Sequence, residues 1–491
     1  MRTQVHKKTG AWTAWLKFLP LFVFAGMVIV FQMDLLLAAP IATFCALIVY
    51  MIVSGGGFEE AFEKGLGSAR KIVVVLFILM FACGTAECFM ATGVGAALIN
   101  LALELGVTAR TIALVALIVT CLLSIATGTS WGTFAACAPI FLWLNHLVGG
   151  DVMLTVCCVA GGSCFGDNIG MISDVTVLSC GMQDVKIIDR MKHQSVWAFG
   201  CLAVAVVVVV AVSLPLPNVQ GDVHAAIAQI PQVAIDALAV ERPSALVLLE
   251  QVKTGVPYYM VIPLVLIIAL SFMGLHTMLC LGAGMVASLI FGVIAGTTDV
   301  STWLNDLLLT GFSDAGSWTV VMMLWVSAFG GIMNSMNAFE PLARLVVRLS
   351  RNVHQLMGWC GVLCMAGNMA LADETAQVAT MSPIIRDIVE KNVECDEQDG
   401  YRLRLRLATF TSAMGIYGSE LVPWHCFPVF FASIANAVYP LKTFTTMDII
   451  AQNYLSFIVV GSILVLTFTG WDRFVPAFRL PADERMRLKK D

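Results

Sequence analysis

Two short polar stretches interrupt apolar segments at positions where an unbroken membrane helix would have its middle. The first covers 127–133 and reads TGTSWGT, and the second covers 166–174 and reads GDNIGMISD. Glycine and small hydroxyl residues there would break a helix and release backbone carbonyl and amide groups. Such groups are tolerated at membrane depth only where they line a cavity or bind something. We therefore expect the region 110–183 to form half of an ion- or substrate-binding site.

Five acidic residues fall at the expected membrane depth in interrupted segments: Asp167, Asp174, Asp373, Glu374 and Glu420. The sequence pattern offers none of them a basic partner. A buried carboxylate without a cationic partner must bind a cation, hold a proton or face water. Na+ prefers oxygen ligands of the kind found at discontinuous transporter helices. We predict Na+ binding at Asp167, Asp174 and Glu420, and we expect the paired Asp174 and Glu420 to share one desolvated site.

Neutral ligands accompany these acids in both halves of the chain. The hydroxyl and amide candidates are Thr127, Thr129, Ser130, Asn168, Ser173, Thr176, Asn368, Thr375 and Ser419. His425 follows Pro423 and Trp424 and could carry a proton or donate to a substrate carboxylate. A structural alternative exists for each group, because acids cap half-helices and a buried histidine can simply pack. For Glu87, inside an earlier apolar helix, the structural alternative is favoured.

The composition indicates an all-α polytopic membrane protein. Hydrophobic residues make up 59% of the 491 residues and charged residues only 12%, and several apolar runs reach the roughly 20 residues that span a bilayer. A Gly-rich loop ending in Lys-Ser/Thr is missing, which argues against an ATP-driven pump. The sequence also lacks a basic nucleic-acid footprint and any catalytic motif. We expect no enzyme activity, no nucleic-acid partner and no cofactor.

Positive charge predicts the topology. Three apolar segments exceed one span: 110–148, 354–385 and 406–438. With a cytoplasmic N-terminus, and with the first two segments read as re-entrant hairpins of opposite orientation, cytoplasmic segments such as 54–71 and 386–406 collect most of the positive charge, as membrane proteins favour. All 28 Lys and Arg then lie in these segments except Arg110, Arg242, Lys253 and Lys442. No Lys or Arg is left in a membrane core.

This topology predicts two inverted repeats, an architecture of secondary transporters. Each repeat has five transmembrane helices and one re-entrant hairpin, with interrupted helices at the midplane. The first repeat covers 1–214, an extracytoplasmic linker covers 215–255, and the inverted second repeat with a short cytoplasmic tail covers 256–491. One constant offset pairs Asp174 with Glu420 and residue 127 with Asp373.

Three motifs carry a family resemblance. The run TGTSWGTFAACAPI resembles the TSWGT-type segment of the NhaC family of Na+/H+ antiporters, GDNIGMISDVTVLS is similar to its G-D…S-D-T-T segment, and GIYGSELVPWHCF is similar to its late Pro-Trp-Asn segment. The resemblance implies exchange of Na+ for protons, or a related exchange of organic acids. The residues that match the motifs are Thr129, Ser130, Asp167, Ser173, Asp174, Thr176, Ser419, Pro423 and Trp424. The sequence departs from the pattern at Val175 and His425.

Two functions remain open at this point. The first is a Na+/H+ antiporter of the plasma (inner) membrane with both termini in the cytoplasm. Its expected partners are Na+, protons, the bilayer and a second copy of the chain in a homodimer. The second is a Na+- or H+-coupled carrier of a small carboxylate or amino acid. Its anion would rest on half-helix N-termini at Thr129–Ser130 and Gly418–Ser419. The lack of an arginine at membrane depth favours the first function.

Overall fold

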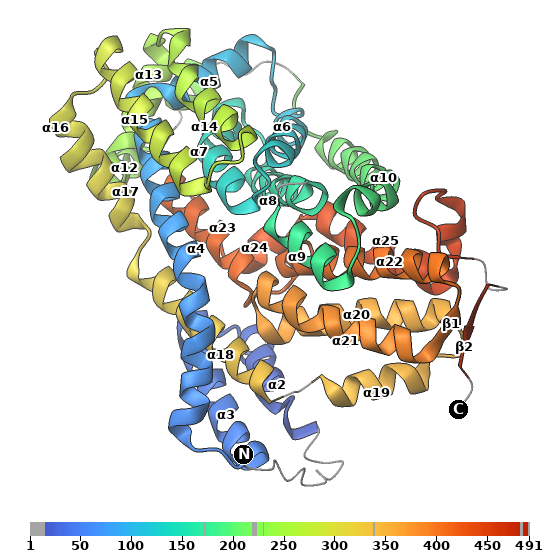
Figure 1. Cartoon of the computed structure of the whole chain (residues 1–491). Helices are drawn as coiled ribbons and strands as arrows, with labels where there is room; N and C mark the ends of the chain where they lie inside the picture. Colours follow the sequence, from blue (N-terminus) through green and yellow to red (C-terminus); the bar gives the residue numbers. More distant parts are fainter. Residues whose placement is uncertain are drawn as a thin grey trace.

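The computed structural model describes most of the chain, and the described part is almost entirely helical (Figure 1). The N-terminal basic residues as far as Lys8 lie outside the described residues, as do Met171 and Ile172 of the second polar stretch. The described ranges are 15–170, 173–218, 223–228, 230–336, 339–481 and 485–489.

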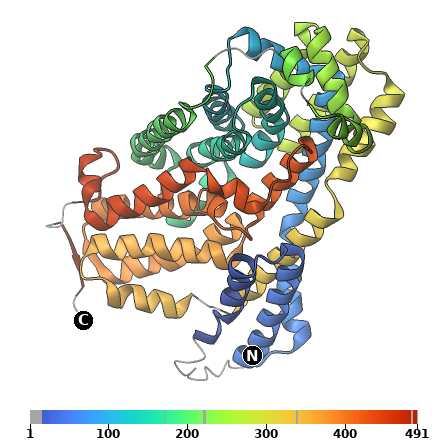
Figure 2. The same cartoon turned by 180° about the vertical axis from the view of Figure 1, so that it is seen from behind.

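One side of the molecule consists of long apolar helices arranged around α4 (Phe58–Thr92). Figures 1 and 2 show α4 extending from α3 and α18 at one end to α15 and α17 at the other. Its 35 residues correspond to about 52 Å at 1.5 Å per residue, more than the roughly 30 Å of a hydrocarbon core. The other elements on this side are α2 (Leu19–Ala25), η1 (Gly26–Val30), α3 (Leu35–Ser54), α5 (Val94–Glu104), η2 (Tyr258–Val261), α14 (Ile262–Phe272), α15 (Thr277–Ala295), α16 (Val300–Thr302), η3 (Trp303–Leu308), α17 (Leu309–Asp314) and α18 (Ser317–Ser335).

The other side holds the helix pairs and the interrupted helices. Both segments that we predicted to be hairpins form pairs of helices, and both segments predicted to be interrupted are broken. Their elements are α6 (Ile112–Thr127), α7 (Ser130–Val148), α8 (Val152–Ile169), α9 (Asp174–Gln183), α10 (Ile187–Ser213), α19 (Glu340–Leu349), α20 (Val353–Leu371), α21 (Glu374–Asn392), α22 (Glu397–Ile416), η4 (Ser419–Leu421), α23 (Cys426–Val438), α24 (Thr446–Ala451), α25 (Tyr454–Thr469) and η5 (Trp471–Phe474).

The helices identify a polytopic membrane protein. Within the described residues, six helices are long and apolar enough to cross a bilayer. A seventh span results if Glu397–Leu421 and Cys426–Val438, which bend by 48° at their break, count as one. The re-entrant orientation of the two hairpins remains a prediction. The inverted relation of the two halves remains a prediction as well.

The tips of the two hairpins have the same backbone conformation. Gly128 ends α6 with φ 65° and ψ 19°, and Ala372 ends α20 with φ 53° and ψ 21°. The next residues, Thr129 and Asp373, are extended with φ −140° and −143°. The helices that follow, α7 and α21, have 19 residues each. Thr129 therefore corresponds to Asp373, where the sequence offset had predicted residue 127.

Several segments that we placed between the membrane helices are themselves largely helical, because apolar runs mark only part of each helix. Most of 54–70 belongs to α4, whose first turn carries Glu59 and Glu60, acids that complement the positive end of the helix dipole. In 386–406, α21 and α22 leave only a short connection. Its strand β1 (Val393–Cys395) pairs antiparallel with β2 (Met486–Leu488). The described part of the linker 215–255 forms α11 (Val223–Ala228), α12 (Gln232–Glu241) and α13 (Pro243–Thr254).

Substitution of Gly166 tests how closely the first half of the broken helix, α8, packs against α6. A Cβ added to Gly166 would lie 1.9 Å from the backbone nitrogen of Ile125 in α6, so Gly166→Ala must push α8 away from α6. We expect a loss of about 1–3 kcal/mol of stability or more, measured as a lower melting temperature of the detergent-solubilised protein. Gly200→Ala in α10 is the control, because its Cβ would meet nothing within 4 Å. Equal melting temperatures for the two variants would contradict the close packing of α6 and α8.

Candidate functional site

Asp167 joins the first broken helix to the tip of the first hairpin. It lies near the end of α8 and is 4% exposed. One carboxylate oxygen accepts from the backbone N–H of Ser130 at 3.1 Å and from its hydroxyl at 2.7 Å, and the other accepts from the hydroxyl of Ser173. Ser130 is the first residue of α7, so the carboxylate occupies the positive end of that helix. We had predicted that the N-terminus of this half-helix binds a substrate anion, but in the structure Asp167 occupies it.

Glu374 joins the two hairpin tips to each other. It is the first residue of α21 and is 8% exposed. One of its oxygens accepts from the indole N–H of Trp131 in α7 at 3.1 Å. Its other oxygen has no hydrogen-bond partner among the described atoms. Glu374 also lies close enough to Asp167 to interact with it electrostatically.

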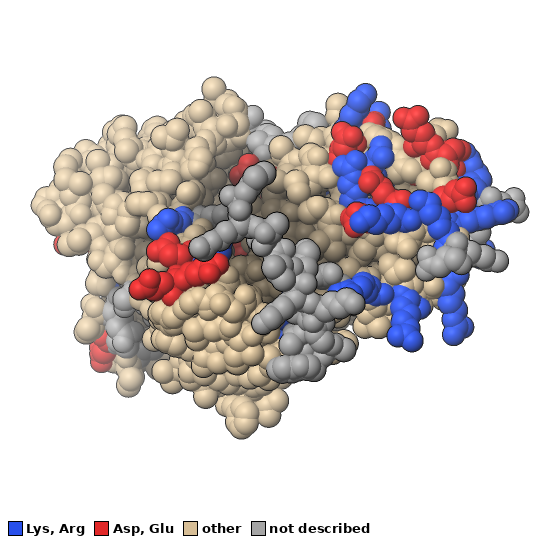
Figure 3. Space-filling view, turned by 60° about the horizontal axis from the view of Figure 1, so that its bottom comes forward, with Lys and Arg blue, Asp and Glu red and all other residues tan. Residues whose placement is uncertain are grey.

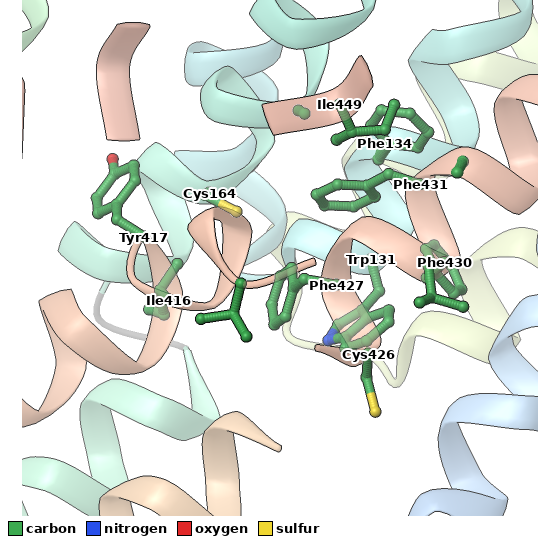
Figure 4. Close-up of a cluster of buried hydrophobic side chains, with 14 of the residues drawn as sticks. Trp131, Phe134, Cys164, Ile416, Tyr417, Cys426, Phe427, Phe430, Phe431 and Ile449 are labelled. Atoms are coloured by element: carbon green, nitrogen blue, oxygen red, sulfur yellow. The ribbon is translucent and has the colours of Figure 1, made fainter. Parts of the chain in front are cut away.

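Aromatic rings enclose the contact between the tips. The ring of Trp131 lies 4.5 Å from that of Phe427 and 4.6 Å from that of Phe430, centroid to centroid. Figure 4 shows these rings packed together, with Phe431 and Phe134 beside them. These rings form an apolar wall beside Trp131, and low-dielectric surroundings of this kind strengthen the hydrogen bond from its indole to Glu374.

Glu420 is buried in the break of the second interrupted helix. It lies in η4 and is 0% exposed. One carboxylate oxygen accepts from the hydroxyl of Ser456 in α25. The other has no partner at full hydrogen-bond geometry among the described atoms, although the side chains of Cys164 and Asn453 lie beside the carboxylate. Cys164 of α8 lies within electrostatic range of Glu420, Asp167 and Glu374. The three buried acids therefore lie around one region of α8.

His425, Ser419 and Asn368 form a separate buried network. The hydroxyl of Ser419 lies 3.0 Å from Nε2 of His425 and 3.2 Å from the amide oxygen of Asn368. The other ring nitrogen of His425 accepts from the backbone N–H of Phe427, which makes this histidine the N-cap of α23. In this structure His425 is thus a buried, hydrogen-bonded histidine, as its structural alternative expected, and it also caps α23.

Asp174 and Glu420 do not share a desolvated site, and that prediction was wrong. Asp174 is the first residue of α9, and its side chain is exposed, whereas Glu420 is fully buried. The two residues also differ in register, because Asp174 opens a half-helix as Cys426 does, while Glu420 precedes the second half-helix. Asp174 remains near the site, since it interacts electrostatically with both Asp167 and Glu374.

The remaining predicted residues divide into two groups. Thr127 and Thr129 are half-buried and line a cavity against α14 and α15, where the hydroxyls of Thr127 and Thr133 lie 2.8 Å apart. Asp373 caps α21 by accepting from the N–H of Ala376 at 2.6 Å, and Thr375 is exposed. Among the described residues, no group of three or more His, Cys, Asp or Glu could hold a metal ion.

The sequence analysis missed a buried arginine at the first helix break. Arg190 of α10 is 0% exposed. It donates to the backbone carbonyl of Asn168 at 3.1 Å and to the hydroxyl of Thr176 at 2.9 Å, and also to the hydroxyl of Ser412. Within the described part of the chain, no carboxylate forms an ion pair with it. The predicted topology assigned Arg190 to a cytoplasmic segment, whereas the structure buries it within the protein near the start of α10.

A second basic residue forms an ion pair with one of the buried acids, although we expected these acids to have no basic partner. Arg242, at the junction of α12 and α13 in the linker, lies 3.6 Å from the carboxylate of Glu87. Glu87 is 3% exposed, so this ion pair ties the linker to α4. The structural interpretation of Glu87 accounts for its position. By contrast, no Lys or Arg of the described ranges pairs with Asp167, Glu374 or Glu420.

Comparison with known proteins now identifies the family. A family model described as the Na+/H+ antiporter family matches residues 6–180 and 162–471. The chain belongs to this family. It is similar to the malate-2H+/Na+-lactate antiporter of Bacillus subtilis (strain 168), with 24% identity over 480 residues, 91% of this chain and 93% of that protein. It is also similar to the arginine/ornithine antiporter ArcD of Halobacterium salinarum, with 22% identity over 375 residues, 71% of this chain and 69% of that protein.

The family and both relatives are transporters, and the resemblance found in the sequence motifs is confirmed. The names of the relatives cover different cargoes, which include protons, Na+, organic acids and amino acids. Membership therefore supports antiport across a membrane and leaves the exchanged species to the residues of the site.

Arg190→Gln tests the support of the first helix break. The shortened side chain loses charge-assisted hydrogen bonds to Asn168 and Thr176, and each such bond contributes about 1.5–3 kcal/mol. We expect a loss of about 3 kcal/mol, seen as a lower melting temperature in detergent. Lys192→Gln, at an exposed position of the same helix, should change stability by less than about 0.5 kcal/mol. An unchanged melting temperature for Arg190→Gln would show that the break needs no cation.

Proposed function

We propose that this family member exchanges Na+ for protons, and that Glu374 and Glu420 carry the exchanged cation. One observation supports the proposal above the others. Each of these buried carboxylates has one oxygen without a hydrogen-bond partner among the described atoms, and neither has an ion pair there. Burying an ionised carboxylate in this way is very costly. Each group is therefore stable either with a proton or with a bound cation.

The two forms of Glu374 provide the coupling. A proton neutralises the carboxylate in its apolar wall, and a Na+ ion does the same by coordination, so one must leave as the other arrives. Trp131 keeps one oxygen of Glu374 in place and leaves the other available. Asp167, whose charge is already held by Ser130, Ser173 and the N-terminus of α7, then positions the first hairpin and does not need the cation.

We further infer that the halves are inverted repeats that expose this site alternately. The matching tips at Gly128 and Ala372, and the equal lengths of α7 and α21, support the inference. The contact from Trp131 to Glu374 links one repeat to the other, so a change at Glu374 is felt by both hairpins. We expect both termini to be cytoplasmic, because this orientation puts most of the Lys and Arg on the cytoplasmic side, and we propose the plasma membrane as the location.

A second candidate function is exchange of small carboxylates coupled to Na+ or protons. Two observations favour it. Arg190 is a buried cation beside the first helix break, and no carboxylate of the described residues balances its charge. The relative from Bacillus subtilis is named for malate and lactate. In this version Glu374 and Glu420 carry the coupling cation, and Arg190 contributes positive potential that attracts the substrate anion.

Glu374→Gln tests the first proposal. The amide keeps the shape and the acceptor for Trp131 but neither titrates nor offers a charge to Na+. We expect the purified variant, reconstituted in liposomes, to lose Na+-driven proton movement, followed with an enclosed pH-sensitive dye. Glu397→Gln, at an exposed acid of α22, is the control and should match the wild type. Normal exchange by Glu374→Gln would eliminate Glu374 as a carrier.

Substrate panels distinguish the two functions. Wild-type liposomes under an imposed pH gradient should take up radioactive Na+ when no organic acid is present, if the protein exchanges Na+ for protons. If Na+ moves only when malate or lactate is on one side, the carboxylate exchanger replaces the Na+/H+ antiporter. In that case Glu374→Gln should lose carboxylate exchange as well, because the coupling cation has no carrier.

A further inference from the structure

A basic cavity lies at the C-terminal end of α25, and none of the buried acids Asp167, Glu374 and Glu420 lines it. Its volume is about 520 Å³, and four arginines line it together with His354. The arginines are Arg402 of α22, Arg473 of η5, and Arg479 and Arg485 of the C-terminal segment. Figure 3 shows charged side chains gathered at this end of the molecule, where β1 and β2 lie in Figure 1.

A buried ion pair forms the floor of the cavity. Arg406 and Asp472 are 0% and 1% exposed, and their charged groups are 3.1 Å apart. Arg406 also donates to the hydroxyl of Thr467 at 2.7 Å, and its guanidinium lies 3.7 Å from the centre of the Phe478 ring. Asp472 accepts the backbone N–H of Leu480 at 2.7 Å. The acid in the floor is therefore already matched by its own arginine and does not neutralise the rim.

The rim retains positive charge. Arg402 and Arg485 face Asp399 at 3.8 and 2.9 Å, and Arg485 also faces Asp396 at 3.2 Å. Arg473 and Arg479, which are exposed, form no ion pair within the described ranges. Asp483 and Glu484, which follow Pro481 in the sequence, lie outside those ranges. The described groups thus leave two guanidinium groups at the cavity mouth for an anion from outside the protein.

Exposed aromatic residues flank the same mouth. Trp471 and Phe474 are 55% and 69% exposed and follow α25, a helix without a charged residue. Trp and other large aromatic side chains at the end of a membrane helix are typical of the zone where lipid headgroups meet the hydrocarbon core. A basic pocket between membrane helices at this level is suited to an acidic lipid headgroup.

We propose that this cavity binds a phosphate group, and that its source is the headgroup of an anionic phospholipid. Guanidinium groups match phosphate oxygens in geometry as well as in charge. The ligand would connect three elements, because the cavity includes His354 of α20, Arg402 of α22 and Thr469 of α25. Two of these helices lead to the second hairpin tip and to Glu420. Bound lipid therefore stiffens the support of the second half of the site.

The test measures binding to the full-length protein in a neutral detergent. The probes are dioctanoyl phosphatidylglycerol, dioctanoyl phosphatidylcholine and inorganic phosphate, and the readout is the melting temperature as a function of probe concentration. We expect phosphatidylglycerol to stabilise the wild type and phosphatidylcholine to do so far less. Arg473→Gln combined with Arg479→Gln should weaken the apparent affinity for phosphatidylglycerol roughly thirtyfold.

A matched control removes the same charge elsewhere. Lys192→Gln combined with Lys391→Gln, at exposed positions of α10 and α21, should retain wild-type affinity. If inorganic phosphate alone stabilises the wild type but not the arginine variant, the phosphate site stands and its ligand is a soluble phosphate. If both double variants respond to phosphatidylglycerol as the wild type does, or if no probe stabilises the wild type, the proposal is overturned.

Discussion

The carboxylate of Asp167 at the N-terminus of α7 is the contact on which the rest of the site depends. A helix that begins inside the protein exposes backbone N–H groups that need acceptors. Asp167 supplies an acceptor from another helix and so fixes the first hairpin tip against the first broken helix. Only with that tip fixed does the indole of Trp131 point at Glu374. The link between the hairpins therefore rests on one acid that also appears in the family motif.

The sequence predicted the parts of the fold that follow from helix breaking. Glycine and hydroxyl residues at 127–133 and 166–174 indicated breaks, and both breaks are present. Asp167, Ser130 and Ser173 were correctly grouped as neighbours of the first break. The helix ends were not predictable from hydropathy, because charged residues such as Glu59 and Glu60 continue α4 beyond its apolar run. A hydropathy pattern reports the lipid-facing length and not the hydrogen-bonded length.

The errors within the site have a common physical origin. Counting charges along the chain assigned Arg190 to a loop, yet its guanidinium reaches back to the carbonyl of Asn168. A long side chain can thus serve a helix break that lies over ten residues away in sequence. Likewise, a constant offset paired Asp174 with Glu420, but the second break extends over more residues than the first. The residue that the offset assigns to Asp174 therefore falls inside the second break, whereas the residue that opens the second half-helix is Cys426.

The two halves differ where the tips meet, and this difference supports the proposal that Glu374 carries a cation. At the first tip, the backbone N–H of Ser130 donates to Asp167, which belongs to another helix. At the second tip, the N–H of Ala376 donates to Asp373, which belongs to the tip itself. No acid of α22 is needed to cap α21, and the stretch of α22 near its break contains none. The position equivalent to Ser130 is then free to hold an acid, and it holds Glu374. Asp373 already accepts a backbone N–H at the start of α21, so the second oxygen of Glu374 is not needed to cap that helix. A carboxylate oxygen that binds a proton or Na+ must be available in this way.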